Sequence, residues 1–317
     1  MNWIKVIIFS LLLGLSCAAT SADTSPLDQQ LRDAAAEGSV EKIRELLDKG
    51  AFVDAPGKYG KTPLMLAAET GNIDAVALLL SRGANVNART RSGSTPLTFA
   101  AENGFRAITG LLVEMGANVH DRTRAGWNSL MIAAREGYDN IVAQLLEFGA
   151  DIRASDRKGN SALMYAIEGN HVKTVKTIFH YSDLVAPCVP NKEGVTPLML
   201  AIDKKYEEIV DILIPITKNL NFRDKYGATA LHYAVEAGNM DAVKALIAHH
   251  ADVNIQDVDG ETPLTEAVAL GNVDMVAFLL AHGADPDIKN KKGKNARDIA
   301  REKGADATLK LLASTGK

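Results

Sequence analysis

The chain has 317 residues and a formal net charge of −4, with 35 Lys and Arg against 39 Asp and Glu. This slightly acidic balance argues against a general nucleic-acid-binding protein, which normally carries an excess of basic residues. The two cysteines, Cys17 and Cys188, are too few for a disulfide framework, and no Cys/His spacing typical of a zinc site occurs.

Residues 1–22 have the pattern of a secretory signal peptide. Lys5 is the only charged side chain there, the run 6–15 is apolar, and small residues occupy most of 16–22. The apolar run is shorter than the roughly 20 residues that span a bilayer. We therefore expect cleavage after Ala22 or after Ala19, a short linker over 23–26, and export of the mature chain to a periplasmic or secreted location.

Two alternatives for this first segment would keep the protein at a membrane. The signal could be retained as an anchor, or Cys17 could be lipidated in the manner of bacterial lipoproteins. The lipidation signal prefers a leucine-like residue three places before the cysteine, where this chain has Gly14. Cleavage without lipidation is the simpler expectation, and membrane contact is expected only under the two alternatives.

One motif recurs along the rest of the chain. Its copies are spaced by 33 residues, except for one interval of 35, and such a fixed period indicates a repeat architecture. Eight copies open with a glycine, namely Gly60, Gly93, Gly126, Gly159, Gly194, Gly227, Gly260 and Gly293. A first copy precedes them, and both end copies are polar where the inner ones are apolar, as capping repeats require. We count nine copies, near 27–59, 60–92, 93–125, 126–158, 159–193, 194–226, 227–259, 260–292 and 293–317.

The second copy shows why each unit should fold as a pair of helices. Thr62 can cap the first helix, Pro63 suits its first position, and Gly71 can end it in the left-handed conformation. A second amphipathic helix is predicted from about 72 to 82, and Gly83 ends it. Helices this short are marginal alone, so each pair depends on its neighbours for stability.

The recurrence of Thr-Pro-Leu at this period resembles the ankyrin repeat family, over about residues 27–317. The resemblance implies an all-α ankyrin-repeat solenoid of about nine helix-turn-helix copies, two of them capping, with β-turn fingertips. It also implies a scaffold that binds protein partners through its turn tips and the concave face of its first helices. Together with the signal segment, the chain resembles exported bacterial ankyrin proteins, and we expect a monomer without cofactors.

The middle of the array is irregular. The copy from Gly159 to Gly194 carries two extra residues, and 182–190 replaces the usual exit after its second helix. The next copy has Lys205 where other copies have glycine, and Pro215 near the end of its second helix. One interpretation is an insertion tolerated in a loop, and the other is a kink that divides the array into two binding halves.

No catalytic motif of the serine-hydrolase, zinc-protease or phosphate-loop type occurs, so we predict no enzymatic activity. Asp257, Asp259 and Glu266 imitate part of a calcium loop, but a repeat turn explains them more simply. Methionines at matching places in four copies are expected to pack between repeats. They are Met65, Met131, Met164 and Met199.

Three histidines are the basis of an alternative function. His249 and His282 occupy one place in successive copies, about 10 Å apart, and His250 stands where other copies have glycine. Shared binding of a metal would make the chain a metal- or small-ligand-handling envelope protein. Exposed histidines at helix ends are the simpler interpretation, and no metal site is predicted.

The register of the repeat predicts a charged working surface. A largely basic row is expected on the turn tips: Lys58, Tyr59, Lys61, Arg91, Arg124, Trp127, Arg157, Lys158, Lys192, Lys225 and Tyr226. A mostly acidic row is expected beside it on the first helices: Glu69, Glu102, Arg135, Glu168, Asp203 and Glu236. Such a charge-striped groove would orient a partner and speed its approach, whereas solvation alone would also favour charges at exposed sites.

Trp127 is the strongest single candidate on this surface. Tryptophan is enriched among interface hot spots, and the matching places in other copies hold small, polar or charged residues. The alternative is that its ring folds back on Tyr138 or on a neighbouring turn. Replacement of Trp127 by alanine is predicted to leave the fold intact and to weaken partner binding by about 2 kcal/mol or more.

Overall fold

The computed structural model describes residues 25–181 and 189–314. The predictions for the signal segment, Cys17 and Cys188 lie outside these ranges, as does most of the 182–190 irregularity. Within the described residues the chain forms eighteen α-helices in nine pairs, two short 3-10 helices and no strand. The all-α repeat solenoid expected from the sequence is therefore confirmed. No helix in this part of the chain has the length and apolarity to cross a membrane.

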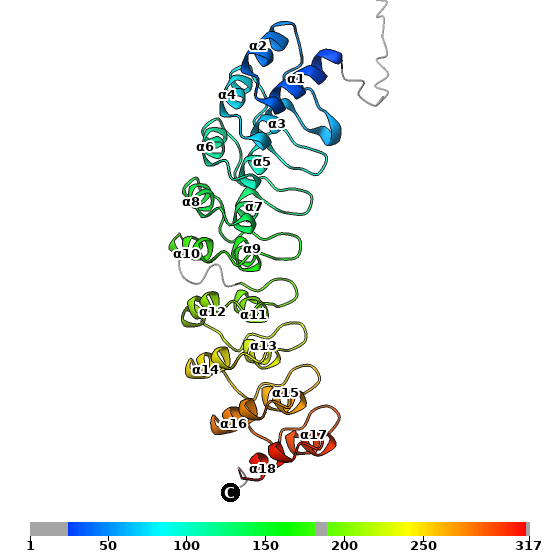
Figure 1. The fold of residues 1–317 in the computed structure, drawn as a ribbon, viewed down its shortest axis with the longest axis vertical. Helices are drawn as coiled ribbons and strands as arrows, with labels where there is room; N and C mark the ends of the chain where they lie inside the picture. The colour runs from blue at the N-terminus through cyan, green and yellow to red at the C-terminus, as the bar shows by residue number, and fades with distance from the viewer. Residues whose placement is uncertain (1–24, 182–188, 315–317) are drawn as a thin grey trace, which may run out of the picture.

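The first helices of the pairs stack side by side into one column. Each of them contacts the next along the whole length of the array. Figure 1 shows this column between the second helices on one side and the turn tips on the other. These helices are α1 (Pro26–Glu37), α3 (Pro63–Thr70), α5 (Pro96–Glu102), α7 (Ser129–Glu136), α9 (Ala162–Glu168), α11 (Pro197–Asp203), α13 (Ala230–Glu236), α15 (Pro263–Leu270) and α17 (Ala296–Glu302).

The second helices form a parallel column, and the array is bowed so that the tips and first helices occupy its concave face (Figure 1). These helices are α2 (Val40–Asp48), α4 (Ile73–Ser81), α6 (Arg106–Glu114), α8 (Asp139–Glu147), α10 (Val172–His180), α12 (Glu207–Leu213), α14 (Met240–Ala248), α16 (Val273–Ala281) and α18 (Asp306–Ser314). The core lies between the two columns, where Leu64 of α3 and Leu79 of α4 are fully buried.

The helix boundaries follow from the capping residues. The Thr62 hydroxyl accepts a hydrogen bond from the Met65 amide at 3.4 Å, Pro63 begins α3, and Gly71 ends it with φ +84°. The Met65 sulfur accepts from the Thr62 amide at 3.4 Å, which closes the cap from the other side. The second helix of this copy runs over Ile73–Ser81, one residue inside each predicted end.

The methionines of the predicted row are buried, as packing between repeats requires. Met65, Met131, Met164 and Met199 are all at most 2% exposed. His232 holds the same place in the seventh copy, where its Nδ1 accepts from the Thr229 amide at 3.1 Å. Burial lowers the pKa of His232 by disfavouring the charged imidazole. In the copies of Met65, Met199 and His232, this buried side chain also offers an acceptor to the cap amide.

A backbone ladder joins the turn tips. The Arg91 amide donates to the Tyr59 carbonyl at 2.9 Å, and the Arg124 amide donates to the Ser92 carbonyl at 2.7 Å. The same bond recurs at each following tip as far as the Lys291 amide. Side chains one row below brace the tips as well, since Arg122 Nη1 donates to the Ser155 carbonyl at 2.6 Å. Successive tips are therefore held at the spacing of the repeat.

The ladder continues across the irregular middle of the array. The Lys192 amide donates to the Lys158 carbonyl at 3.0 Å, and α9 packs directly on α11. Lys205 adopts the left-handed conformation usual for glycine at this place, with φ +58°. Pro215 lies in a 3-10 turn, Ile214–Ile216, that follows α12. The continuous ladder and helix column agree with the interpretation of this segment as a tolerated insertion.

Rings from one copy cover glycines of the preceding copy in the first half of the array. An added Cβ on Gly71 would lie 2.5 Å from the Phe105 ring, and one on Gly104 would lie 2.9 Å from the Tyr138 ring. The corresponding glycine in the eighth copy, Gly271, has no atom within 4 Å of such a Cβ. The two halves therefore differ in how tightly this junction is packed.

Candidate partner-binding surface

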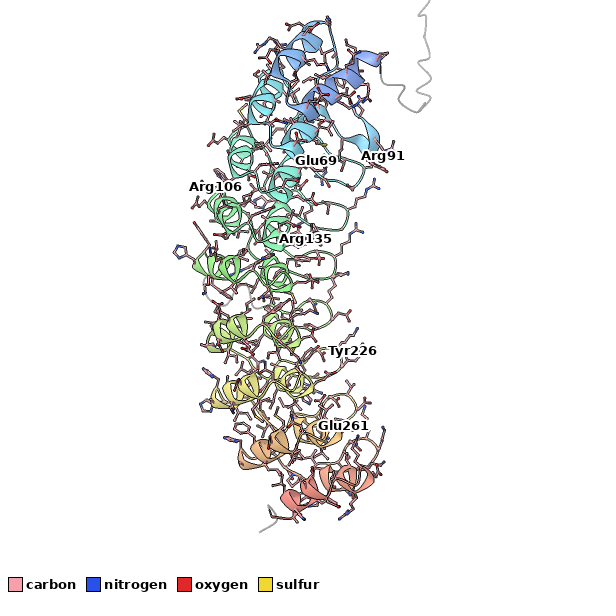
Figure 2. All side chains as sticks on the ribbon, in the orientation of Figure 1. Glu69, Arg91, Arg106, Arg135, Tyr226 and Glu261 are labelled. Atoms are coloured by element: carbon pink, nitrogen blue, oxygen red, sulfur yellow. The ribbon has the colours of Figure 1, made fainter. Side chains whose placement is uncertain are left out.

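A row of basic residues follows the turn tips through six consecutive copies. Each residue is exposed and lies two positions before the glycine that opens the next copy. The six are Lys58, Arg91, Arg124, Arg157, Lys192 and Lys225. Val258 interrupts this row in the seventh copy, and Lys291 continues it in the eighth. Figure 2 shows the labelled Arg91 and Tyr226 on the tip side of the array, with Glu69 and Arg135 closer to the helices.

Two tips combine a lysine with an exposed tyrosine. Lys58 Nζ lies 5.0 Å from the centroid of the Tyr59 ring, and Lys225 Nζ lies 4.8 Å from that of Tyr226. Lys225 also pairs with Glu193 of the preceding tip. Both tyrosines are about 60% exposed. Large amphipathic rings at this exposure are suited to contact with a partner.

The four basic tips between these pairs are differently placed. Among the described residues, Arg91, Arg124, Arg157 and Lys192 have no carboxylate partner within ion-pair distance. Lys158, which directly follows Arg157, is exposed as well. These charges are therefore available to an acidic group from outside the chain.

The structure corrects the expected position of Lys61. Its Nζ lies 2.6 Å from Glu69 Oε2 and 4.7 Å from the centroid of the Phe99 ring. The residue after the motif's glycine leads back toward the first helix, so its side chain meets the helix and not the tip. The same pair recurs in the last copy as Lys294 and Glu302, at 2.6 Å. Lys61 and Glu69 therefore largely neutralise one another on the concave face.

Trp127 occupies the corresponding place in the fourth copy and is also not at a tip. Its half-buried ring lies 4.4 Å, centroid to centroid, from the ring of Tyr165 in the next copy. Arg135 Cζ lies 4.7 Å from the Trp127 ring. In the alternative interpretation the ring would fold back on Tyr138 or on a neighbouring turn, but the Tyr138 ring lies against Gly104 and the indole packs on Tyr165. The indole therefore forms part of an inter-repeat cluster and remains partly exposed.

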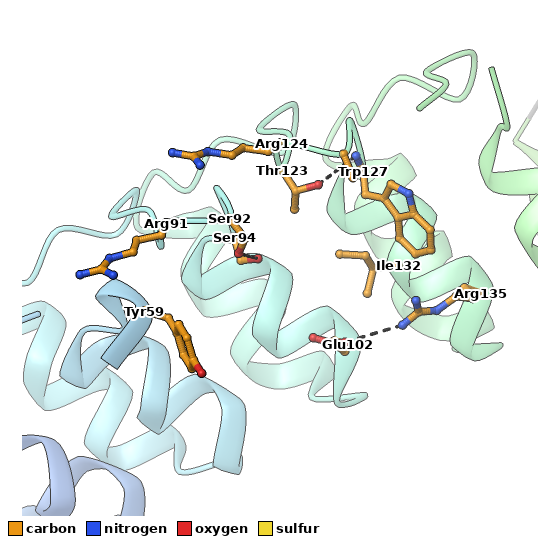
Figure 3. A pocket seen from close by; sticks show the side chains of 11 residues that line it. Tyr59, Arg91, Ser92, Ser94, Glu102, Thr123, Arg124, Trp127, Ile132 and Arg135 are labelled. Atoms are coloured by element: carbon orange, nitrogen blue, oxygen red, sulfur yellow. Dashed lines mark hydrogen bonds and ion pairs between the residues drawn. The ribbon is translucent and has the colours of Figure 1, made fainter. Parts of the chain in front are cut away.

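Beside Trp127 the concave face is hollowed. The hollow has a volume of about 680 Å³, with Tyr59 on one side and Trp127 and Ile132 on the other (Figure 3). Arg135 Nη2 lies 2.6 Å from Glu136 Oε1 and 3.6 Å from Glu102 Oε1 at one end of it. The structure thus brings together tip residues and helix residues that the sequence had placed in two separate rows.

Comparison with known proteins agrees with this architecture. A family model described as ankyrin repeats in three copies matches four overlapping segments, 31–123, 97–188, 183–257 and 249–317. The chain belongs to the ankyrin repeat family. Ankyrin repeats generally mediate protein–protein interaction, so the array is an interaction module by its class. A search of curated proteins finds no significant match.

The C-terminal half of the ankyrin array carries a cluster of carboxylates around Glu266. Glu266 of α15 is largely buried, and loss of solvation raises its pKa to about 8, with further contributions from Glu236, Asp257 and Glu261. Asp257 Oδ1 accepts from the Asp259 and Glu261 amides at 2.8 Å each. Asp224 Oδ1 accepts the same pair of bonds in the preceding turn, so Asp257 takes part in an ordinary repeat turn.

The group of His249, His250 and His282 is not gathered into a metal site. His249 and His282 each place Nδ1 against a carbonyl of their own helix, Ala245 at 2.9 Å and Phe278 at 2.8 Å. Within the part of the chain that the structure describes, no group of three or more potential ligands is arranged to hold a metal ion. The histidines therefore give no support to the alternative function.

Sequence reasoning missed one recurring pair. Tyr165 donates its hydroxyl to Asp156 Oδ2 at 2.7 Å, and Tyr233 donates to Asp224 Oδ2 at 2.9 Å. Burial and the neighbouring carboxylate raise the pKa of both tyrosines. The sequence did contain a signal for this pair, because the tyrosine follows the aspartate by nine residues in both cases. Each tyrosine thereby fixes its tip to its first helix.

Proposed function

We propose that this protein is a non-enzymatic scaffold that binds a protein partner outside the cytoplasm. The observation that supports this proposal is the concave face of copies two to five. There, unpaired basic tips adjoin a hollow walled by exposed and half-buried aromatic rings. Aromatic and arginine side chains are the residue types that dominate binding energy in protein interfaces.

The proposed location rests on the sequence of residues 1–22. An exported protein of a bacterial envelope, periplasmic or secreted, agrees with a signal of this pattern followed by a mature chain of repeats. Mass determination of the mature N-terminus tests this directly. A chain that begins after Ala22 or after Ala19 supports export, and a chain that keeps Met1 in the cytoplasmic fraction contradicts it.

Partner capture tests the binding function. Mature protein is crosslinked in its native compartment, and the captured partner is identified and titrated against purified protein. We expect Trp127→Ala to weaken binding by about 2 kcal/mol, or about 30-fold, because the indole borders the binding face. Met115→Ala is the matched control, since this exposed apolar side chain follows α6 in the outer column.

The stability of both variants is measured alongside. Trp127 contacts Tyr165, so its removal is expected to cost about 1 kcal/mol of folding free energy without loss of the array. Equal affinity of the Trp127→Ala protein and the control, with both folded, would remove Trp127 from the interface. Absence of any partner in the envelope and secreted fractions would contradict the scaffold function itself.

A further inference from the structure

The proposed scaffold function leaves the chemistry of the partner open, and the hollow between copies two and four bears on it. We propose that this hollow binds an extended acidic segment of the partner. One large apolar side chain of the segment enters the hollow against Trp127 and Ile132, and flanking carboxylates pair with Arg91 and Arg124. This inference rests on the proposed function and specifies its partner.

The electrostatics of the rim support an acidic occupant. Arg91 and Arg124 extend in the same direction from successive tips, as Figure 3 shows, and neither has a carboxylate partner among the described residues. The tip ladder fixes the backbone of both residues, at 2.9 and 2.7 Å. The points from which the two side chains extend are therefore fixed, and their charges are free to pair with an external anion.

Small residues open the hollow at this point of the array and not at its neighbours. The position before the opening glycine holds Ser92 at the end of the second copy and Ala125 at the end of the third. The same position holds the larger Tyr59 in the first copy and Lys158 in the fourth. The place after the glycine holds Ser94, where the next copy has Trp127. The resulting space of about 680 Å³ is ample for one large side chain, and Ile132 and the indole give it an apolar wall.

The occupant is a peptide segment and not a uniformly charged polymer. Glu102 lines the same hollow, and Arg135 is already paired with Glu102 and Glu136, so this end carries no surplus positive charge. A polyanion would place charge beside Glu102 and leave the apolar wall uncovered. An extended peptide can direct an apolar side chain inward and carboxylates toward the rim, because alternate side chains point to opposite faces.

The spacing of the tips sets the spacing of the acidic residues. Packed helices of successive repeats lie about 10 Å apart, and an extended chain advances about 3.3 Å per residue. Side chains on one face of an extended chain lie about 6.6 Å apart at two residues and about 13 Å apart at four, which brackets this spacing. Carboxylates two or four residues apart would therefore reach Arg91 and Arg124 together, with the apolar residue between them. A longer segment that continued toward the C-terminal half of the array would approach the acidic surface near Glu236 and Glu266, which favours a short acidic stretch.

The test is selection of peptides from a random library on the full mature protein. Selected peptides are titrated against wild type, the Arg91→Glu/Arg124→Glu variant, and the charge-matched control Arg106→Glu/Lys173→Glu on α6 and α10 of the outer column. We expect selected sequences to carry two acidic residues two or four places apart, with a large apolar residue between them. The first variant should weaken binding at least 30-fold and the control less than about threefold, with a loss of affinity at high salt.

All four substituted side chains are exposed, so circular dichroism and thermal unfolding should match wild type for both variants. Selection on the Arg91→Glu/Arg124→Glu variant should enrich basic peptides, which a merely structural role of the arginines would not produce. Neutral peptides that depend on Trp127 and ignore the charge reversal would overturn the acidic segment and leave the scaffold function standing.

Competitors test the other classes of ligand. Polyglutamate, a single-stranded oligonucleotide and anionic vesicles should displace a selected peptide only weakly, because none of them presents an apolar side chain between spaced charges. Binding of any of these as tight as that of the peptide would overturn the proposal. Absence of any selected peptide and of any captured partner would contradict the scaffold function as well.

Discussion

The first five copies, α1–α10, and the last four, α11–α18, share one backbone plan but present different chemistry on the concave face. In the fourth copy the residue four places after the cap is Ile132, which forms an apolar wall beside Trp127 and the basic tips. In the eighth copy the same place holds Glu266, whose pKa is raised to about 8 among other carboxylates. The contrast teaches that caps, glycines and buried leucines fix the array, while the exposed face varies freely.

The halves also differ at the junction between copies. Phe105 and Tyr138 cover Gly71 and Gly104 in the first half, whereas Gly271 in the second half has open space beside it. Tighter packing at this junction buries more apolar surface per copy, which favours a more stable first half. Three measurements test this comparison, from the largest expected effect to the smallest.

Gly71→Ala and Gly271→Ala form a matched pair, since both glycines end a first helix in the left-handed conformation. Gly71→Ala is expected to destabilise the protein by about 3 kcal/mol, because left-handed strain adds to a clash with the Phe105 ring. Gly271→Ala carries the strain alone and is expected to cost about 1 kcal/mol. Urea unfolding, with hydrogen exchange to localise the loss, measures both. Equal costs would show that the rings do not tighten the first half.

Glu266→Gln tests the acidic half through pH. Between pH 4.5 and about 8 the folded state keeps a proton on Glu266 that the unfolded state has released, so stability falls as the pH rises through this range. Glutamine stays neutral at every pH, so the variant does not lose stability in this range. We expect the variant to be more stable than wild type by about 2 kcal/mol at pH 9 and nearly equal to it at pH 5.

Denaturant titrations at the two pH values measure this difference. Glu168→Gln, an exposed carboxylate of α9 in the first half, is the control and should show no such dependence. A difference between wild type and Glu266→Gln that does not change with pH would contradict the raised pKa of Glu266.

Tyr165→Phe and Tyr233→Phe compare the same hydrogen bond, from a tyrosine hydroxyl to an aspartate of its tip, in the two halves. Each change leaves a buried oxygen of Asp156 or Asp224 without its tyrosine donor, and we expect a cost of about 1 kcal/mol in each half. Tyr138→Phe is the control, because the atoms of that side chain nearest to Gly104 are ring carbons, which phenylalanine keeps. Thermal unfolding of the three variants is the measurement. A clear inequality between Tyr165→Phe and Tyr233→Phe would show that the halves differ in this pair as well.

The fold was predictable from the sequence because its determinants are local. Thr62, Pro63 and Gly71 each act within one turn of their own helix, and the period repeats their signal in other copies. The methionine places were predictable for the same reason, since register alone puts them between repeats. Helix ends were accordingly found within one residue in the copy taken as the type.

The candidate site was less predictable because it depends on the direction of side chains between copies. Register placed Lys61 and Trp127 on the tips, but the chain turns back toward the helix at this place, and the two side chains meet Glu69 and Tyr165. The pKa of Glu266 depends on three carboxylates that come from two different copies. Such properties require the distances between copies, which periodicity alone does not provide.

The ladder between the tips has a consequence for how such a protein can change. Its rungs use only main-chain atoms, as between Arg91 and Tyr59 or between Lys192 and Lys158. A mutation at one tip therefore alters what that loop recognises without displacing the loops beside it. New binding preferences can accordingly arise through single substitutions, each tried independently, while the folded scaffold is inherited unchanged.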